Sequence, residues 1–212
     1  MPIFALSEEV IFPPVELSED DGLLAVGGDL SPQRLLLAYR MGIFPWYNRK
    51  PILWWSPDPR FVLYPEELKV SRSMRQVLTR NIFEITVNQN FKSVILNCKQ
   101  APREGQSGTW ITREVMNAYL KLHQLGHAHS VEAWQNGELV GGLYGVRVGN
   151  VFCGESMFAK VSNASKAAFI TYIKQLQSEG VQLIDCQMET EHLASFGGRF
   201  ITRDEFVRAL RA

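Results

Sequence analysis

The chain has 212 residues, 46% of them hydrophobic, and its 22 Lys and Arg residues balance 22 Asp and Glu residues. This length and hydrophobic content allow a sizeable buried core, so the chain should fold unaided. A formal net charge of zero excludes a molecule-wide field that attracts nucleic acid or a membrane surface, so any polyanion site must be a local patch.

The three cysteines, Cys98, Cys153 and Cys186, lie in apolar segments without metal-ligand spacing, which indicates reduced core residues. The first residues do not form a basic region followed by a long apolar one, and no run approaches the roughly 18 apolar residues that a membrane span needs. We therefore expect a cytoplasmic protein that does not engage a membrane.

Charge is segregated along the chain. Residues 1–33 contain seven acidic residues and no Lys or Arg, whereas residues 69–103 contain seven basic residues and one acid, Glu84. Two differently solvated surfaces would explain this distribution, and so would separate binding places for a polyanion and a cation.

The first sixty residues combine Pro, Gly and aromatic residues into turn-rich segments around small apolar clusters. One helix is clear, because Ser31 is a good N-cap, Pro32 suits the first helical position and Gly42 can end it. We predict a small irregular N-terminal domain over residues 1–62. Its Trp residues either attach it to the next domain or stack on a ligand.

From Leu63 onward the apolar periodicity becomes regular and indicates a second domain over residues 63–212. Three antiparallel strands in a row, then a helix and a strand, predict the α+β class. The polar loop over residues 101–109, which carries Arg103 and Glu104, is either a lid or a connector. The periodicity predicts helices over residues 71–80, 90–98, 112–126 and 162–180, strands over residues 83–87, 129–134, 138–148, 151–158 and 181–187, and a last strand and helix over residues 200–212.

Polar side chains near the ends of two apolar strands indicate a site. Asp185 and Gln187 are two residues apart, so regular strand alternation puts both on one face. Glu155 follows Gly154 in the preceding strand. Because an unpaired buried carboxylate is costly, Asp185 should have partners, access to water or a function. Alternatively, it only ends the strand and caps the next turn.

Standard catalytic signatures are absent from the sequence, which has no Gly-x-x-x-x-Gly-Lys, Gly-x-Gly-x-x-Gly, Gly-x-Ser-x-Gly or His-Glu-x-x-His. His127 and His129 share a strand face, but no third ligand is evident, so we expect no metal site. No cofactor motif is visible. Trp110, Met157 and the helix over residues 169–176 could form an apolar pocket that selects a small apolar group by shape.

Seven segments occur in this order: Phe44-Pro45-Trp46, Trp54-Trp55-Ser56-Pro57-Asp58-Pro59-Arg60, Gly108-Thr109-Trp110-Ile111-Thr112, Gly126-His127-Ala128-His129-Ser130, Gly154-Glu155-Ser156-Met157-Phe158, Ala164-Ser165-Lys166 and Ile184-Asp185-Cys186-Gln187. In order and spacing they resemble the leucyl/phenylalanyl-tRNA–protein transferase family over nearly the whole chain. The departures are small, such as Phe196 and Gly198 where Leu and Ala are more usual.

This resemblance implies a small N-terminal domain followed by a GNAT-like acyltransferase domain with a mixed, mainly antiparallel sheet. It also implies transfer of Leu or Phe, less often Met, from aminoacyl-tRNA to a protein whose N-terminal residue is Arg or Lys. Such a transfer marks the acceptor protein for N-end rule degradation. Because the tRNA ester is already activated, the resemblance implies neither ATP nor CoA nor another cofactor.

In that reaction Asp185, Gln187 and Glu155 would be the catalytic residues. An α-amino group has a pKa near ~8, so a usable neutral fraction exists at neutral pH and positioning matters more than activation. Gln187 would orient the amine, and Asp185 would polarise Gln187 or accept a proton through it. Alternatively, a ribose hydroxyl of the tRNA shuttles the proton. Glu155 would hold the acceptor's amino group or place the aminoacyl-adenosine end.

The transferred side chain would enter a deep apolar pocket that is narrow at the β-carbon, because Leu, Phe and Met are unbranched there. Tyr172 and Leu176 would instead be plain core residues if their helix only packs on the sheet. The outward arginines of the helix over residues 71–80, namely Arg72, Arg75 and Arg80, are the expected tRNA contacts. The expected pocket residues are Trp110, Gly154, Met157, Tyr172, Leu176 and Ile184.

Two alternatives remain open. A GNAT enzyme that uses acetyl-CoA would need a Gln/Arg-x-x-Gly-x-Gly/Ala loop at a helix N-terminus, where this chain has Ser162-Asn163-Ala164-Ser165-Lys166. A non-catalytic module that binds tRNA ends or basic protein N-termini would also use paired carboxylates. Turnover distinguishes an enzyme from such a module.

Overall fold

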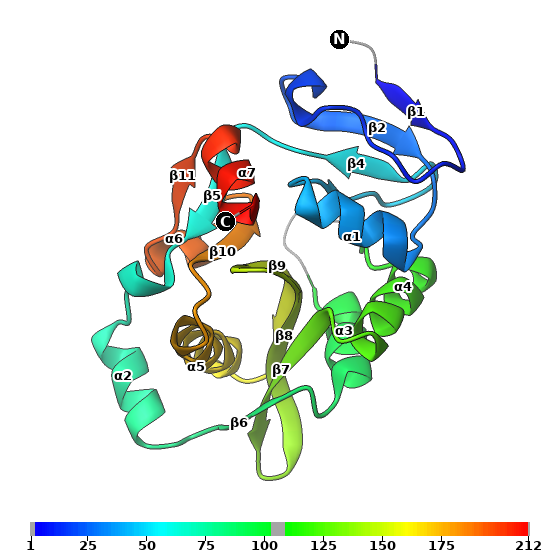
Figure 1. Ribbon diagram of the computed structural model, residues 1–212. Helices are drawn as coiled ribbons and strands as arrows, with labels where there is room; N and C mark the ends of the chain where they lie inside the picture. The colour runs from blue at the N-terminus through cyan, green and yellow to red at the C-terminus, as the bar shows by residue number, and fades with distance from the viewer. Residues whose placement is uncertain (1–2, 103–108, 212) are drawn as a thin grey trace.

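The computed structural model describes residues 3–102 and 109–211, which form two β-sheets surrounded by helices (Figure 1). The loop residues Arg103 and Glu104, expected to belong to a lid or a connector, lie outside the described residues.

The N-terminal part builds a four-stranded sheet in the order β1-β2-β4-β3. Helix α1 (Pro32–Arg40) begins as predicted, since Ser31 Oγ accepts a hydrogen bond from the backbone N–H of Arg34 at 3.3 Å and Pro32 holds the first position. Gly42 follows the helix in the left-handed region, with a φ of 78°. The strands are β1 (Phe4–Leu6), β2 (Leu23–Gly27), β3 (Phe44–Pro45) and β4 (Leu53–Trp55), and the short 3-10 helix η1 (Val15–Leu17) precedes β2.

The second sheet has seven strands in the order β11-β5-β10-β9-β8-β7-β6. Its neighbouring strands pair antiparallel, except that β9 and β10 run parallel. The predicted α+β class and the mixed, mainly antiparallel sheet are therefore confirmed. The strands are β5 (Arg60–Leu63), β6 (Glu84–Val87), β7 (Ala128–Gln135), β8 (Glu138–Val148), β9 (Val151–Ala159), β10 (Leu183–Gln187) and β11 (Arg199–Ile201).

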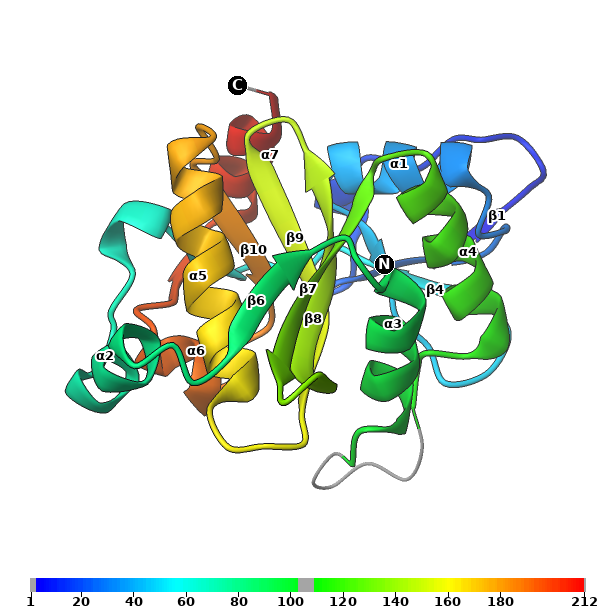
Figure 2. The same ribbon diagram turned by 90° about the horizontal axis from the view of Figure 1, so that it is seen from below.

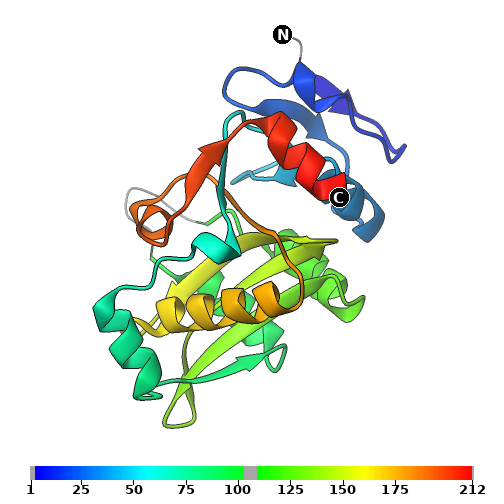
Figure 3. The same ribbon diagram turned by 60° about the vertical axis from the view of Figure 1, so that its left-hand side comes forward.

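Helices cover both faces of this sheet (Figure 2). Helix α5 (Ala164–Ser178) packs on β7, β8 and β9 from one side, and α3 (Phe91–Gln100) with α4 (Arg113–Gln124) packs from the other. Helix α2 (Arg72–Thr79) contacts α5. The 3-10 helix η2 (Pro65–Glu67) precedes α2 in the chain. After β10 come the short α6 (Glu191–Ser195) and then α7 (Arg203–Arg211), which lies against α1 (Figure 3).

Local capping and turn chemistry explains where most predicted elements begin and end. Ser71, Asn90 and Thr112 each accept a hydrogen bond from the backbone N–H three residues ahead, at 3.2 Å. Asn136 and Gly137 join β7 to β8 with φ values of 53° and 78°. These predicted boundaries are confirmed.

The sequence does not predict strand β5, because the first sixty residues are expected to form turn-rich segments around small apolar clusters. In the structure Arg60 begins a fully buried strand that pairs with β10 on one side and β11 on the other. Both partner strands lie far downstream in the sequence, so no local pattern announces the pairing. Strand β5 also crosses the expected domain boundary between residues 62 and 63, and that boundary stays a prediction.

One apolar core joins the two parts of the chain. Trp54 and Leu35 of the N-terminal part are fully buried in the same cluster as Tyr119 of α4 and Val146 of β8. A second cluster fills the space between α5 and the large sheet. The N-terminal part therefore packs firmly against the α3 and α4 side of the molecule, and the functional site lies next to this junction.

Candidate active site

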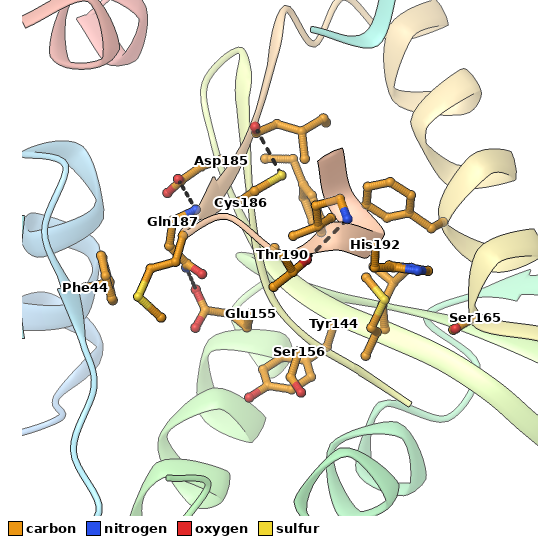
Figure 4. Close-up of a pocket in the computed structure, with 18 of the residues that line it drawn as sticks. Phe44, Tyr144, Glu155, Ser156, Ser165, Asp185, Cys186, Gln187, Thr190 and His192 are labelled. Atoms are coloured by element: carbon orange, nitrogen blue, oxygen red, sulfur yellow. Dashed lines mark hydrogen bonds between the residues drawn. The ribbon is translucent and has the colours of Figure 1, made fainter. Parts of the chain in front are cut away.

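The site lies where the parallel strands β9 and β10 stop pairing. Their register runs from the pair Leu183 and Val151 to the pair Asp185 and Cys153, and β9 then continues to Ala159. A cavity of about 500 Å³ occupies this position. In Figure 4, Phe44 of the N-terminal sheet lies at one end of the cavity, and His192 and Ser165 lie at the other.

Glu155, which is partly exposed in β9, is the centre of a hydrogen-bond cluster. The Tyr39 hydroxyl at 2.7 Å and Gln187 Nε2 at 3.1 Å both donate to its Oε1 atom, and the Tyr119 hydroxyl lies 3.1 Å from Oε2. The hydroxyls of Tyr39 and Tyr119 also bond to each other. Helices α1 and α4 and strands β9 and β10 thus meet at one carboxyl group.

The protonation of Glu155 follows from this cluster. Both phenols donate hydrogen bonds to the carboxyl oxygens of Glu155, and such bonds favour its ionised form. Burial raises the pKa of Glu155 to about 7, although the hydrogen bonds from Tyr39 and Tyr119 oppose the shift. Burial also raises the pKa of both tyrosines well above the usual value, so they stay neutral. Glu155 therefore changes charge near neutral pH.

Asp185 is fully buried and forms an ion pair with Arg60. Arg60 donates through Nε to Oδ1 and through Nη2 to Oδ2, each at 2.8 Å. Asp185 Oδ1 also accepts the backbone N–H of Gln187 at 2.9 Å. The partners that the sequence requires for this carboxylate are thus a buried guanidinium and a backbone amide.

The expected regular alternation of Asp185 and Gln187 is wrong, because β10 is irregular between them. The register against β5 shifts at this point, and Gln187 has a φ of 60°, in the left-handed region. The resulting turn directs the Gln187 side chain to Glu155, while Asp185 contacts the Gln187 backbone (Figure 4). Asp185 therefore contacts Gln187 through the backbone N–H, and its role in the reaction stays a prediction.

Four of the six residues expected to form the pocket do line the cavity: Trp110, Gly154, Met157 and Ile184. Tyr172 and Leu176 do not; both are buried in the core under α5, where the Tyr172 ring packs edge-on against Phe152. The cavity meets the N-terminal half of α5, and Ser165 and Phe169, four residues apart, line it there. The core interpretation of Tyr172 and Leu176 is therefore the one that the structure supports.

The three arginines expected to contact tRNA lie away from the cavity lining. Arg72 and Arg75 are exposed on α2, and Arg80 is exposed as its C-terminal cap. Arg75 Nε donates to the carbonyl of Val70 at 3.2 Å. They form an exposed basic face at the edge of the molecule, and its tRNA role stays a prediction.

Sequence reasoning missed the partners of the carboxylates. Tyr39 and Tyr119 look like apolar residues of two amphipathic helices, yet a buried phenol needs a hydrogen-bond partner, and that need was the available signal. Arg60 gives no signal beyond its position after Pro59. His192 also lines the cavity; its buried Nε2 atom has no partner among the described residues, and burial lowers the pKa of the ring.

Within residues 3–102 and 109–211, no group of His, Cys, Asp and Glu side chains is arranged to hold a metal ion. No helix among these residues is long and apolar enough to cross a bilayer.

Comparison with known proteins decides the family. Residues 62–211 match the model of the leucyl/phenylalanyl-tRNA protein transferase family, and residues 28–58 match the model of its N-terminal domain. A leucyl/phenylalanyl-tRNA–protein transferase of Flavobacterium johnsoniae is 55% identical over 99% of this chain and 100% of the relative. One of Syntrophobacter fumaroxidans is 57% identical over 99% of this chain and 90% of the relative.

This chain belongs to the leucyl/phenylalanyl-tRNA–protein transferase family. It is an aminoacyltransferase that acts on proteins, as the relatives' shared name describes. The acetyl-CoA-dependent enzyme and the non-catalytic module, which the sequence left open, do not describe this transferase family.

Solved structures resemble this transferase more distantly. The C-terminal domain of a putative lysylphosphatidylglycerol synthetase from Agrobacterium fabrum matches with a TM-score of 0.49 and 9% identity over 88% of this chain and 70% of that chain. A GCN5-related N-acetyltransferase from Kribbella flavida matches with a TM-score of 0.40 and 10% identity over 79% of this chain and 60% of that chain.

Proposed function

We propose that the enzyme transfers Leu or Phe, and less often Met, from aminoacyl-tRNA to the N-terminal Arg or Lys of an acceptor protein, which marks that protein for N-end rule degradation. The observation that carries this proposal is the pocket itself, in which an apolar chamber opens beside the hydrogen-bonded pair Glu155 and Gln187. An apolar side chain and a basic amine thus find complementary surfaces within one cavity.

The apolar chamber is the proposed binding place for the transferred side chain. Met157, Phe169 and Ile184 come from three different elements and enclose it, with Trp110 on a further wall. Leu, Phe and Met are flexible or flat beyond an unbranched β-carbon, whereas Ile and Val carry a branch at the chamber's mouth. Steric exclusion of that branch supports the proposed donor preference.

Glu155 is the proposed contact for the acceptor's amino group. An α-ammonium has a pKa near ~8, and burial raises the pKa of Glu155 to about 7. Since the two values are close, the proton passes from the ammonium to the carboxylate at the low cost of about 1.4 kcal/mol per pKa unit. The neutral amine that results is the nucleophile.

Gln187 is the proposed positioning group for that amine. Its Nε2 donates to Glu155, which leaves its carbonyl oxygen to accept a hydrogen bond from the amine. The nitrogen then attacks the ester carbonyl carbon, so a C–N bond forms while the bond from carbon to the ribose 3′ oxygen breaks. The nitrogen gives its second proton to the departing oxygen, directly or through the neighbouring ribose hydroxyl. The ester supplies the activation, so the proposal needs no ATP, CoA or metal.

The proposed tRNA contacts are Arg72, Arg75 and Arg80. Their exposure on one helix and the lack of acidic residues within α2 favour a phosphate-binding face. We also propose a cytoplasmic location, where aminoacyl-tRNA is made. Three buried free cysteines suit that reducing compartment.

A filter assay with labelled Phe-tRNA and a protein that begins with Arg tests the proposed function. We expect time-dependent incorporation of label without ATP or CoA. The control is the same protein beginning with Ala, which should stay at background. Equal incorporation into both acceptors would contradict the proposed acceptor, and no incorporation into either would contradict the reaction.

A further inference from the structure

Arg60 is one of the most deeply buried charged residues in the described part of the chain. Only 2% of its surface is exposed, and it stands at the start of β5. Its guanidinium lies between two aromatic rings, with Cζ 4.7 Å from the ring centre of Phe44 and 4.6 Å from that of Phe206. Phe44 belongs to β3 and lines the cavity, whereas Phe206 belongs to α7. The two rings fix the plane of the guanidinium.

In that plane the guanidinium meets Asp185 edge to edge. The two parallel hydrogen bonds, each 2.8 Å long, set both the position and the rotation of the carboxylate. Lys could supply the charge, but not the planar fork or the stacking between rings. The identity of the residue therefore matters here, and not only its charge.

A buried ion pair is weak evidence for function by itself, because it can serve the fold alone. This pair differs from a purely structural one because Asp185 also contacts Gln187. Asp185 Oδ1 accepts the backbone N–H of Gln187, at the residue whose left-handed backbone ends β10. The Gln187 side chain then reaches Glu155 at 3.1 Å. A single series of contacts thus runs from Arg60 through Asp185 and Gln187 to Glu155.

We propose that Arg60 is a positioning residue for the transfer reaction: through Asp185 it holds the left-handed turn that presents Gln187 to Glu155 and to the acceptor amine. This inference rests on the proposed function of Gln187 and Glu155. Arg60 itself lies outside the cavity lining and touches no reacting atom, so its effect on the reaction passes through the Asp185 carboxylate.

The test compares Arg60→Lys with a matched control, Arg34→Lys. Arg34 is 0% exposed, donates to backbone carbonyls of Ser7 and Glu9 at 2.9 and 3.0 Å, and lies outside the cavity lining. We expect Arg60→Lys to lower kcat about 10- to 100-fold, the effect of a small misplacement, with the KM for donor and acceptor within about two-fold of wild type. Arg34→Lys should lower the melting temperature and leave kcat unchanged.

A double-mutant cycle with Gln187→Ala separates positioning from general damage. If Arg60 acts through Gln187, Arg60→Lys should cost less than about two-fold in kcat once Gln187 is Ala, because the effects are then not additive. Full additivity, or equal loss of kcat in Arg34→Lys, would overturn the proposal.

Phe206→Leu keeps the experiment decisive if Arg60→Lys does not fold. It removes one ring of the stack without unpairing Asp185, and it should show a smaller loss of kcat with the same dependence on Gln187. A wild-type enzyme that fails to transfer label to the Arg-ended protein would overturn the proposed function as well. Normal wild-type transfer with additive variants would reject the Arg60 inference alone.

Discussion

Glu155 combines a pKa near neutrality with three hydrogen-bonding neighbours that are themselves neutral. Such a carboxyl group can bind an ammonium when it is ionised, and it can accept a proton from that ammonium before the amine attacks the ester. Ordinary exposed glutamates are already ionised far below neutral pH and are poor proton acceptors there.

Replacing Glu155 with Gln should therefore slow transfer and change its pH dependence. We expect the single-turnover rate near neutral pH to fall about 10²- to 10⁴-fold, the usual worth of a general base. The wild-type rate should rise with pH as Glu155 ionises near 7, whereas the variant should follow only the acceptor amine near ~8. Rates measured across both pKa values, with Glu138→Gln as an exposed control, check this. Superimposable profiles would exclude Glu155 as the base.

Asp185 and Gln187 should differ in what their loss does to stability. The sequence predicts that Ala at either position slows transfer and leaves folding intact. The burial of Asp185 changes the expectation for folding at that position. Asp185→Ala strands the Arg60 guanidinium in the core, which should cost about 3–5 kcal/mol of unfolding free energy. Gln187→Ala should cost about 1 kcal/mol, the value of one hydrogen bond. Denaturant unfolding of both variants measures the two free energies of unfolding. Equal values would contradict the argument from the burial of Asp185.

Met157 should influence which donor is preferred. Its flexible thioether side chain lines the chamber and can adjust to Leu or Phe. Met157→Ala should enlarge the chamber and lower the preference for Leu-tRNA over Phe-tRNA by roughly 1–3 kcal/mol. A competition between the two donors at fixed acceptor measures the ratio, with Met116→Ala as the control, because Met116 is partly buried against the core and lies outside the cavity lining. An unchanged product ratio would place the side chain elsewhere.

At the scale of the element, α2 is a short helix with one buried residue, Met74, and an exposed basic face. Its packing against α5 fixes the orientation of that face relative to the sheet. A phosphate-binding role would make donor binding depend on salt, because each neutralised phosphate releases counterions.

Removing the charges of Arg72, Arg75 and Arg80 should weaken donor binding and flatten its salt dependence. Each lost phosphate contact should reduce the slope of log K against log salt by about 0.7 to 0.9. Titrations of Leu-tRNA at several salt concentrations measure the slope, and Lys121→Ala on α4, which packs on the opposite face of the sheet, is the control. A slope equal to that of the wild type would show that the tRNA binds away from α2.

Elements defined by nearby residues could be predicted from the sequence, and elements defined by distant ones could not. Ser71, Asn90 and Thr112 cap helices through contacts three residues away, and Asn136-Gly137 turns a hairpin by its own backbone preference. Strand β5 instead exists because β10 and β11 come to lie on either side of it. Periodicity carries no information about such partners.

The candidate site divides in the same way. Asp185, Gln187 and Glu155 stand out because polar side chains interrupt apolar strands, which is a local feature. The contacts of these residues with Arg60, Tyr39 and Tyr119 join elements that are far apart in the chain. The irregular end of β10 also follows from a tertiary contact, since Asp185 holds the Gln187 amide. The partners of the two carboxylates could therefore be identified only from the three-dimensional structure.

For the whole molecule, Glu155 links stability to pH. Between pH 4.5, the usual value, and about 7, the native state keeps a proton on Glu155 that the unfolded chain has lost. The unfolded state then binds fewer protons, so the free energy of unfolding falls as pH rises through this window and levels off above it. The lowered pKa values of Glu67, Glu179 and Glu205 act in the opposite sense, at lower pH.

Glu155→Gln should remove this fall. The free energy of unfolding of the wild type minus that of the variant should decrease from about pH 4.5 to 7 and stay constant above that range. Urea titrations at matched ionic strength measure it. A difference that is independent of pH would mean that the carboxyl titrates normally in the native state.

The stack around Arg60 also has a consequence for how the protein is made. Strand β5 emerges from the ribosome early, but the strands on both sides of it and the ring of Phe206 belong to residues 183–211. Until those residues are translated, Phe61, Val62 and Leu63, which are buried in the native state, lack their partner strands. The Arg60 guanidinium also lacks the Asp185 carboxylate. A nascent chain in which β5 is still unpaired therefore exposes apolar surface of the kind that chaperones bind.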